Sequence, residues 1–412
     1  MKKVLFTFYA IMLCCICLKA ANGEFKFNNM YYISTSDSTA KLSRGYLVGD
    51  IVIPDTVTKG GNKYAVTEIE SGAFSDVCYC NPRITTVTIP ATMKVIRTQA
   101  FSGQTNITDI YFLGGNITFE SSVFALSNFI SRKVHINSFE EWCNNQYPQS
   151  NNTGVRTANP LYGAYMYIDG ELLTNVHLSS NIKTISANAF EGVLNSIVLT
   201  CDTGLVSIGD YAFMNSKIKD IEFPSSLKSI GQYAFRQCPI HNLVIPENVS
   251  YIGSYAFDYN GTFHKIVWKA KNMHCQRNTP AYAAFSVTSG NLDTLIVDSG
   301  VVSLPEYMFY STIYAVKPVI ISYNKNVPYA YQNTFYAVNK KSPLYVPKGK
   351  RTAYMSGWGF SNVYEMEEEE ETTKVETLEE NANTHNRKIL RNGQIYIVRG
   401  EKTYTITGSE VK

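Results

Sequence analysis

The sequence predicts a mainly β solenoid with short helical turns, in which each coil of 22–23 residues contributes one short parallel strand. Two observations lead to this prediction: an Ala-Phe dipeptide recurs along the chain, and alternating apolar residues followed by a proline precede it in the clearest copies. From Phe190 to Phe257 the spacing is 23, 22 and 22 residues, a period typical of stacked repeat units. The dipeptide or a degenerate copy ends at Phe74, Phe101, Phe124, Phe190, Phe213, Phe235, Phe257, Phe285, Phe309 and Phe335.

The clearest repeat unit spans Asp220–Phe235. Ile221 and Phe223 alternate as in a short strand with one buried face. Pro224 ends that strand because proline has no amide proton for the sheet. The unit Asn242–Phe257 repeats the pattern, and we expect tight bends at Gly231 and Gly253. Equivalent phenylalanines of successive coils should form a stacked ladder, with each alanine leaving room for a ring.

Further copies of the pattern read VTIPATMKVIRTQAF from Val87, NIKTISANAF from Asn181 and GDIVIPDTVTKGGNKYAVTEIESGAF from Gly49. With these motifs the chain resembles the BspA-like leucine-rich repeat proteins, which are exported surface proteins of anaerobic bacteria and some parasites. The resemblance covers Gly49–Tyr364. It implies a leucine-rich-repeat solenoid and a role in adhesion or protein binding at the cell surface.

The first 23 residues have the order of a secretory signal: two lysines, an apolar run from Val4 to Leu18, and then small residues. We expect cleavage after Ala20 or Gly23 and a location outside the cell or on its outer surface. The run is too short for a transmembrane helix. Acylation of a cysteine in this segment is the less favoured alternative, and the candidates are Cys14, Cys15 and Cys17.

The predicted mature chain has four parts. Residues 24–50 form an N-terminal cap, and 51–364 form the solenoid, with an insertion at about 131–173. Ser138 begins a capping box, so we expect a helix over 139–146 whose Trp142 packs against the coil. Asp169-Gly170 marks a hairpin turn.

The end of the chain differs in composition from the solenoid. Residues 365–386 contain an acidic run that we interpret as a linker, in preference to a calcium site. Residues 387–412 carry six basic side chains against two acidic ones, with Asn-Gly and Arg-Gly turns that predict a small β module. This module resembles the C-terminal sorting or anchoring tails of exported bacterial proteins.

The cysteines and histidines predict no cofactor and no metal site. No pair has the spacing of zinc ligands. We favour buried free thiols over a disulfide framework for the six cysteines of the mature chain, although an exported protein permits both. They are Cys78, Cys80, Cys143, Cys201, Cys238 and Cys275.

No catalytic motif is assembled in the sequence: it contains no nucleophile elbow, Walker loop, zinc-protease motif or dinucleotide fingerprint. We therefore expect a binding protein and not an enzyme. Nucleic acid is not a predicted partner, since the net charge is only +3 and the basic surplus lies in the C-terminal module.

The outward residues of the predicted strands are the candidate binding surface for an extracellular protein, such as a host matrix or bacterial surface protein. Val244, Val267 and Ile296 are the proposed apolar anchors, although strand propensity explains them equally well. The full set comprises Thr86, Thr88, His177, Val198, Glu222, Val244, Val267 and Ile296.

Three tyrosines recur two residues before a phenylalanine, at Tyr211, Tyr233 and Tyr255, and should stack as a stripe. Aromatic stripes can hold sugar rings, so glycan binding is the second functional hypothesis. Shielding of adjacent backbone is the more ordinary interpretation. A purely structural surface component is the third hypothesis, and it predicts self-association.

Overall fold

The structure is a computed structural model of the 412-residue chain. It describes residues 23–76, 84–125, 127, 131–148, 158–261, 263–273, 284–286, 292–310, 317–366, 387–391, 394–399, 402–405 and 410–411. The predicted signal, Cys78, Cys80, Cys275 and most of the acidic linker lie outside the described residues. Two compact units divide the chain: Met1–Leu173 with Ser186–Asn195, and Thr174–Ile185 with Ser196–Lys412.

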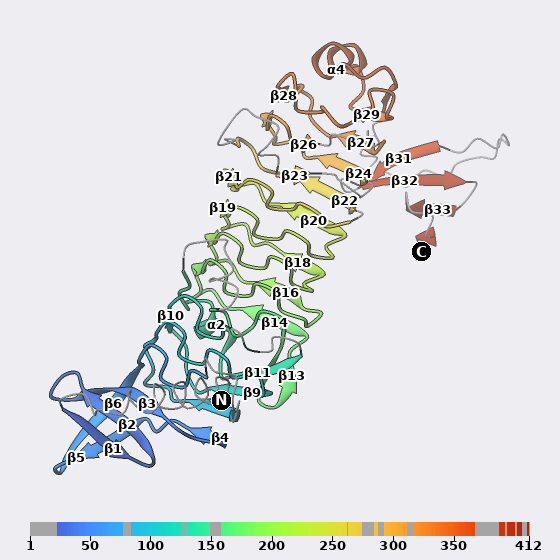
Figure 1. Cartoon of the computed structure of the whole chain (residues 1–412). Helices are drawn as coiled ribbons and strands as arrows, with labels where there is room; N and C mark the ends of the chain where they lie inside the picture. The colour runs from blue at the N-terminus through green and yellow to red at the C-terminus, as the bar shows by residue number, and fades with distance from the viewer. Residues whose placement is uncertain are drawn as a thin grey trace, which may run out of the picture. The chain divides into compact units, whose positions relative to one another are not determined.

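The first unit contains two sheets (Figure 1). One has the order β1-β2-β3-β6-β8-β10, with β5 also paired to β6. Its strands are β1 Glu24–Phe27, β2 Met30–Ser34, β3 Thr39–Gly45, β5 Thr56–Lys59, β6 Asn62–Ile69, β8 Val95–Ile96 and β10 Thr118–Phe119. The other has the order β13-β12-β11-β9-β7-β4. Its strands are β4 Gly49–Val52, β7 Ile84–Ile89, β9 Asp109–Phe112, β11 Arg132–Ile136, β12 Ala164–Ile168 and β13 Glu171–Leu172.

The second unit repeats this arrangement with parallel strands of successive coils side by side. Its main sheet has the order β20-β22-β24-β27-β29-β30. These strands are β20 Asn242–Ile245, β22 Phe263–Trp268, β24 Leu292–Val297, β27 Val319–Ser322, β29 Leu344–Val346 and β30 Val363–Glu365. A three-stranded sheet contains β14 Asn175–Leu178, β16 Val198–Cys201 and β18 Asp220–Glu222.

Shorter strands form the other side of the coils in this unit. One sheet comprises β15 Thr184–Ile185, β17 Ser207–Ile208, β19 Ser229–Ile230 and β21 Tyr251–Ile252. Two pairs follow, β23 Phe285–Ser286 with β26 Phe309–Tyr310, and β25 Ser303–Leu304 with β28 Tyr329–Ala330. The helix α4 Arg351–Trp358 buries Tyr354 and Trp358. The predicted fold class, a mainly β solenoid with parallel strands, is confirmed.

The phenylalanine ladder lies in the core between the two sides of the coils. Phe213, Phe235, Phe257 and Phe285 stack with ring centroids 5.1, 5.4 and 5.0 Å apart and nearly parallel planes. The alanines before them, such as Ala212, Ala234 and Ala256, are completely buried. The predicted ladder is therefore present, and the small alanine allows the close approach of neighbouring coils.

Gly231 and Gly253 serve a different purpose from the predicted tight bend. Neither has a positive φ. A Cβ atom added to Gly231 would lie 2.5 Å from the amide nitrogen of Asp210, and one added to Gly253 would lie 2.4 Å from that of Gln232. These glycines are needed because the backbone of the preceding coil passes against them.

The residue two positions before each phenylalanine adopts the left-handed conformation, which non-glycine residues rarely adopt. The φ angles of Tyr211, Tyr233 and Tyr255 are 59°, 56° and 57°. The same position is left-handed in Gly72, Gln99, Ser122, Asn188 and Tyr307. The turn that introduces the buried phenylalanine therefore has one backbone geometry in coils of different sequence.

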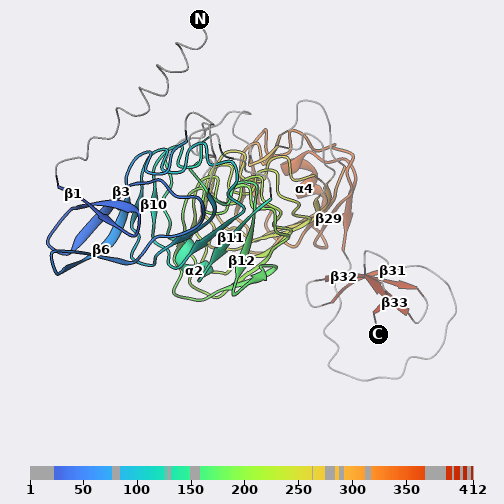
Figure 2. The same cartoon turned by 60° about the horizontal axis from the view of Figure 1, so that its bottom comes forward.

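The segment predicted as an insertion takes part in the sheet of the first unit. β11 pairs in parallel with β9 on one side and with β12 on the other, and Figure 2 shows β11 and β12 side by side. The helix α2 Phe139–Trp142 is shorter than predicted, and the Ser138 hydroxyl accepts a hydrogen bond from the Glu141 amide as a capping residue should. Asp169 and Gly170, both with positive φ, form the expected turn between β12 and β13.

Trp142 is 1% exposed, and its indole donates a hydrogen bond to the carbonyl of Ala189 at 3.0 Å, so the predicted packing role is confirmed. Phe139 stacks on Phe190 with ring centroids 4.2 Å apart. A helix residue outside the 22-residue period thus supplies an aromatic ring to the core.

The C-terminal residues form the predicted small sheet. It is antiparallel, with the order β31-β32-β33-β34. The strands are β31 Arg387–Arg391, β32 Gln394–Arg399, β33 Lys402–Thr405 and β34 Glu410–Val411.

Candidate functional site

The outward face of the main sheet in the second unit carries a continuous row of apolar side chains. Val244, Val267 and Ile296 occupy the same register on the hydrogen-bonded strands β20, β22 and β24. The register continues through Ile321, Tyr345 and Tyr364 on β27, β29 and β30. We call these six residues the apolar row.

Exposure varies along the apolar row. Val244 is 41% exposed and Tyr364 is 49% exposed, while Val267, Ile296 and Tyr345 are half-buried. Ile321 is buried at 2%. The rings of Tyr345 and Tyr364 stack with centroids 5.4 Å apart. Because the strands lie at the spacing of a parallel sheet, the row offers closely spaced anchors for a partner that crosses several strands.

A polar row runs beside the apolar row, two residues earlier on each of the same strands. It contains Asn242, Lys265 and Thr294, which are also in register. His264 lies near it and pairs with Asp293, with 2.9 Å between Nδ1 and Oδ2. The imidazole of His241 is 5.2 Å from that of His264, measured between ring centroids. The apolar row is thus bordered by hydrogen-bonding groups on this side.

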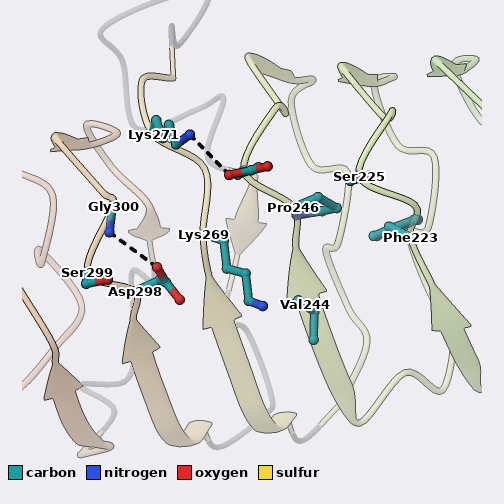
Figure 3. A pocket seen from close by; sticks show the side chains of 10 residues that line it. Phe223, Ser225, Val244, Pro246, Lys269, Lys271, Asp298, Ser299 and Gly300 are labelled. Carbon is teal, nitrogen blue, oxygen red and sulfur yellow. Dashed lines mark hydrogen bonds and ion pairs between the residues drawn. The ribbon is translucent and has the colours of Figure 1, made fainter. Parts of the chain in front are cut away.

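An open pocket of about 470 Å³ borders the other side of the apolar row, where β18, β20, β22 and β24 end (Figure 3). Val244 belongs to its lining. Lys271 pairs with Glu247 at 3.1 Å, and the Asp298 carboxylate accepts a hydrogen bond from the Gly300 amide at 3.2 Å. The complete lining consists of Phe223, Ser225, Val244, Pro246, Glu247, Lys269, Lys271, Asp298, Ser299 and Gly300.

Lys269 is the one lysine of this pocket without an ion pair among the residues that the structure describes. Figure 3 shows its side chain between Val244 and Asp298. Burial raises the pKa of the nearby Tyr323 phenol, and the Asp298 charge raises it further, so that phenol stays neutral at physiological pH. Among the residues that the structure describes, the pocket therefore offers one exposed cation without an ion pair, Lys269, next to the apolar row.

The other predicted surface residues lie elsewhere. Thr86 and Thr88 are on β7 in the first unit, half-buried on the outward face. In the second unit His177 and Glu222 share a register with Thr200 between them, whereas Val198 belongs to the neighbouring register with Asp220. His177 pairs with Asp202 at 3.1 Å. None of the eight predicted residues is buried, but only Val244, Val267 and Ile296 form one apolar group.

Sequence reasoning did not identify Ile321, Tyr345 and Tyr364. The signal for Tyr345 was present, because it lies between the buried Leu344 and Val346 and precedes Pro347, which is the strand pattern of the regular repeats.

The first unit carries an aromatic group on its outward face that sequence reasoning also did not identify. His135 lies between Tyr111 and Tyr167, with ring centroids 4.1 and 5.1 Å away. Its Nε2 atom is 3.0 Å from a carboxylate oxygen of Asp109. Both faces of the imidazole and its Nε2 atom are therefore engaged within the unit.

The tyrosine stripe is present as predicted. Tyr233 stacks on Tyr211 and on Tyr255, with 5.1 Å between centroids in both pairs. Arg236 lies 5.4 Å from the centre of the Tyr233 ring and pairs with Asp258 at 3.0 Å. Since both faces of Tyr233 are covered by its neighbours, this ring has no open face on which a sugar could stack.

The described cysteines are free thiols. Cys143 and Cys238 are buried and Cys201 is half-buried. Burial raises the pKa of the Cys201 and Cys238 thiols to about 12, so neither is a thiolate at neutral pH. Among the residues that the structure describes, no three histidine, cysteine or acidic side chains gather as a metal site. No helix among them is long and apolar enough to span a membrane.

The repeat defines the class of protein. Residues 51–153, 163–264 and 281–390 match the model of the BspA type leucine rich repeat region, in 6 copies, and the chain belongs to this family. No curated protein matches the sequence.

Solved structures of bacterial leucine-rich repeat proteins are similar at low identity. The pneumococcal vaccine antigen PcpA has 15% identity and a TM-score of 0.35, with 85% of this chain and 100% of that chain covered. A leucine-rich repeat protein from Bacteroides ovatus has 16% identity and a TM-score of 0.38, with 82% and 88% covered. A leucine rich cell surface protein from Faecalibacterium prausnitzii has 16% identity and a TM-score of 0.36, with 83% and 94% covered.

Proposed function

We propose that the chain is a non-catalytic, exported surface protein that binds another protein through the apolar row of its second unit. The carrying observation is the shared register of Val244, Val267 and Ile296 on three hydrogen-bonded strands. Membership of a repeat family whose surfaces mediate protein interaction supports the proposal.

The apolar row carries an unfavourable free energy of hydration as long as it stays exposed to water, and a partner that covers it recovers that free energy. Exposed apolar surface contributes about 25 cal/mol per Å² when a partner covers it, and a few anchors usually carry most of the binding energy. The row combines aliphatic anchors with the tyrosine pair Tyr345 and Tyr364, and tyrosine is enriched at such energetic centres.

The flanking groups define the chemistry of the partner. Lys269 beside Val244 favours a carboxylate next to the partner's apolar contact, because an exposed cation attracts and orients such a group. The polar row on the other side suits hydrogen-bonding side chains at the rim. The favoured partner is therefore a folded protein surface with an apolar strip and an acidic residue along one edge.

A pull-down with the mature chain, using purified host matrix proteins and surface extracts of co-resident bacteria, would identify the partner. The triple substitution Val244→Ser, Val267→Ser and Ile296→Ser should then weaken its binding by at least about a hundredfold, since each anchor contributes about 1 kcal/mol or more.

The matched control changes the polar row on the same strands, with Asn242→Ser, Lys265→Ser and Thr294→Ser. This variant should retain binding within about threefold because rim contacts contribute little. Unchanged binding by the apolar-row variant would refute the proposal.

The mature chain is also the sample for tests of glycan binding and of self-assembly. A glycan array should give no saccharide that depends on Tyr233, since the rings of Tyr211 and Tyr255 cover both of its faces. Sedimentation of the mature chain would reveal the oligomers that a purely structural role requires.

A further inference from the structure

In the described residues of the first unit, one of the two sheets has no segment that covers its edge strand. In the sheet that contains β6, β8 and β10, the strands β3, β2 and β1 continue the pairing beyond β6. In the other sheet the order ends at β4, whose one strand partner in the described part of the chain is β7. The N-terminal segment therefore closes one sheet edge and leaves β4 as an edge strand (Figure 1).

The backbone of β4 directs hydrogen-bonding groups away from the sheet. The Ile53 amide donates to the Thr88 carbonyl of β7 at 3.1 Å. Because successive residues of a strand direct their amides and carbonyls to opposite sides, those of Asp50 and Val52 point to the open edge. No partner for them is present among the described residues.

Apolar side chains concentrate at this edge. Val48, Tyr46 and Val52 are 66%, 65% and 64% exposed, which are the three highest values for large hydrophobic residues in the described part of the chain. A Cβ atom added to Gly49 would meet no atom within 4 Å, so the position of its missing side chain is open as well. Proteins usually protect such an edge with charge, proline or a covering segment.

We propose that β4 is a strand-addition site for an extended peptide segment of another protein, carrying a lysine or arginine opposite Asp50 and an apolar residue opposite Val52. These two positions are two residues apart and face the same side of the sheet. The main-chain groups of Asp50 and Val52 supply the pairing, and their side chains select the sequence.

The charge at the edge favours this occupant. The Asp50 carboxylate is exposed and accepts a hydrogen bond from the Thr85 hydroxyl at 2.8 Å. Hydrogen bonds from Thr85 and Thr86 lower the pKa of Asp50, so the carboxylate is charged at neutral pH. A basic residue of the partner would pair with it.

A second copy of this chain fits the edge less well. Residues 46–54 contain no lysine or arginine to place opposite Asp50. The strand spans only Gly49–Val52, and Pro54 follows it without an amide proton. Pairing of two such edges would bury far less than the roughly 1,200 Å² of a stable dimer.

Fluorescence anisotropy with the mature chain tests the proposal, using as probe a fluorescein-labelled, amidated hexapeptide of sequence Thr-Val-Thr-Lys-Thr-Val, in which an apolar residue lies two positions from the lysine on either side. Saturable binding is expected. Val52→Pro removes the outward amide without disturbing the pairing to β7. It should weaken binding about tenfold or more, because the peptide loses one main-chain hydrogen bond to the strand. Val52→Thr keeps that amide and should bind within about threefold of the parent.

The probe itself provides a second test that needs no protein variant. Methylation of the peptide amides that face β4 should abolish binding, whereas methylation of the alternate amides should preserve it. Replacement of the peptide lysine by glutamate should weaken binding about tenfold through repulsion by Asp50.

Three results would overturn the proposal: no saturable binding of the lysine peptide, equal binding of both methylated peptides, or full binding by a folded Val52→Pro variant. A dimer of the parent chain that dissociates on Val52→Pro would assign the edge to self-association instead. The apolar row of the second unit is not involved, so triple serine substitution there should leave peptide binding unchanged.

Discussion

The phenylalanine cores of the two units reach the same packing by different routes. In the second unit, Phe213, Phe235, Phe257 and Phe285 come from equivalent positions of consecutive repeats, and each ring centroid lies within 5.4 Å of the next. In the first unit, Phe74, Phe101 and Phe124 stack in the same way. Phe139 of α2 then stacks on Phe190, although it does not follow the Ala-Phe pattern.

This difference shows that the core requires an aromatic ring at this place, whichever position of the sequence supplies it. The regular repeats place the ring by their period. Where the period fails, a capped helix of four residues places Phe139 and Trp142 against the coil, with Trp142 held by the carbonyl of Ala189. A solenoid can therefore accept an irregular segment when that segment fills the same volume.

The largest expected effect follows the loss of an interior ring in the regular unit. Phe235→Ala should destabilise the second unit by about 3–5 kcal/mol, because the ring is fully buried and is stacked on both faces. Urea unfolding with hydrogen exchange of the neighbouring coils would measure it. A loss below about 1 kcal/mol would contradict the ladder as the main stabilising element.

The helix ring should matter nearly as much. Phe139→Ala removes a buried ring that stacks on Phe190, and we expect a loss of about 3 kcal/mol in the first unit. Glu141→Ala on the same helix is the control, since its side chain is exposed. Equal stability of both variants would show that α2 only covers the coil.

The close approach of coils at Gly231 predicts an intermediate effect. Gly231→Ala should cost about 1–3 kcal/mol because the new methyl group would meet the Asp210 amide of the preceding coil. Gly300→Ala is the control, since its Cβ would make only ordinary contacts at 3.7 Å or more. Thermal melts of both variants should therefore differ, and a neutral Gly231→Ala would refute the packing argument.

The smallest effect concerns the left-handed tyrosines. Tyr233→Ala and Tyr233→Gly both lose the ring stacking, but only alanine keeps the strain of a φ near 56°. The glycine variant should therefore be more stable than the alanine variant by about 1 kcal/mol. The reverse order in chemical unfolding would mean that this turn changes its backbone geometry after substitution.

The sequence predicted more of the outward sheet face in the second unit than in the first unit. The period-two alternation identified Val244, Val267 and Ile296 as outward residues, because a strand of known register alternates its faces. It did not extend to Tyr345 and Tyr364, since the spacing of the last coils is irregular. The engagement of His135 with Tyr111, Tyr167 and Asp109 could not be predicted, because those partners come from two other strands, β9 and β12, of neighbouring coils.

The sequence alone determined the solenoid, its Ala-Phe core, the capping of α2 at Ser138 and the small C-terminal sheet. These features follow from periodic spacing and from local turn and capping chemistry. Only the tertiary structure decided that Phe139 stacks on Phe190, that Gly231 admits the neighbouring backbone, and that β4 is left as an open edge. These features depend on contacts between different coils. Because the number of residues between coils varies, no local sequence pattern shows which residues meet.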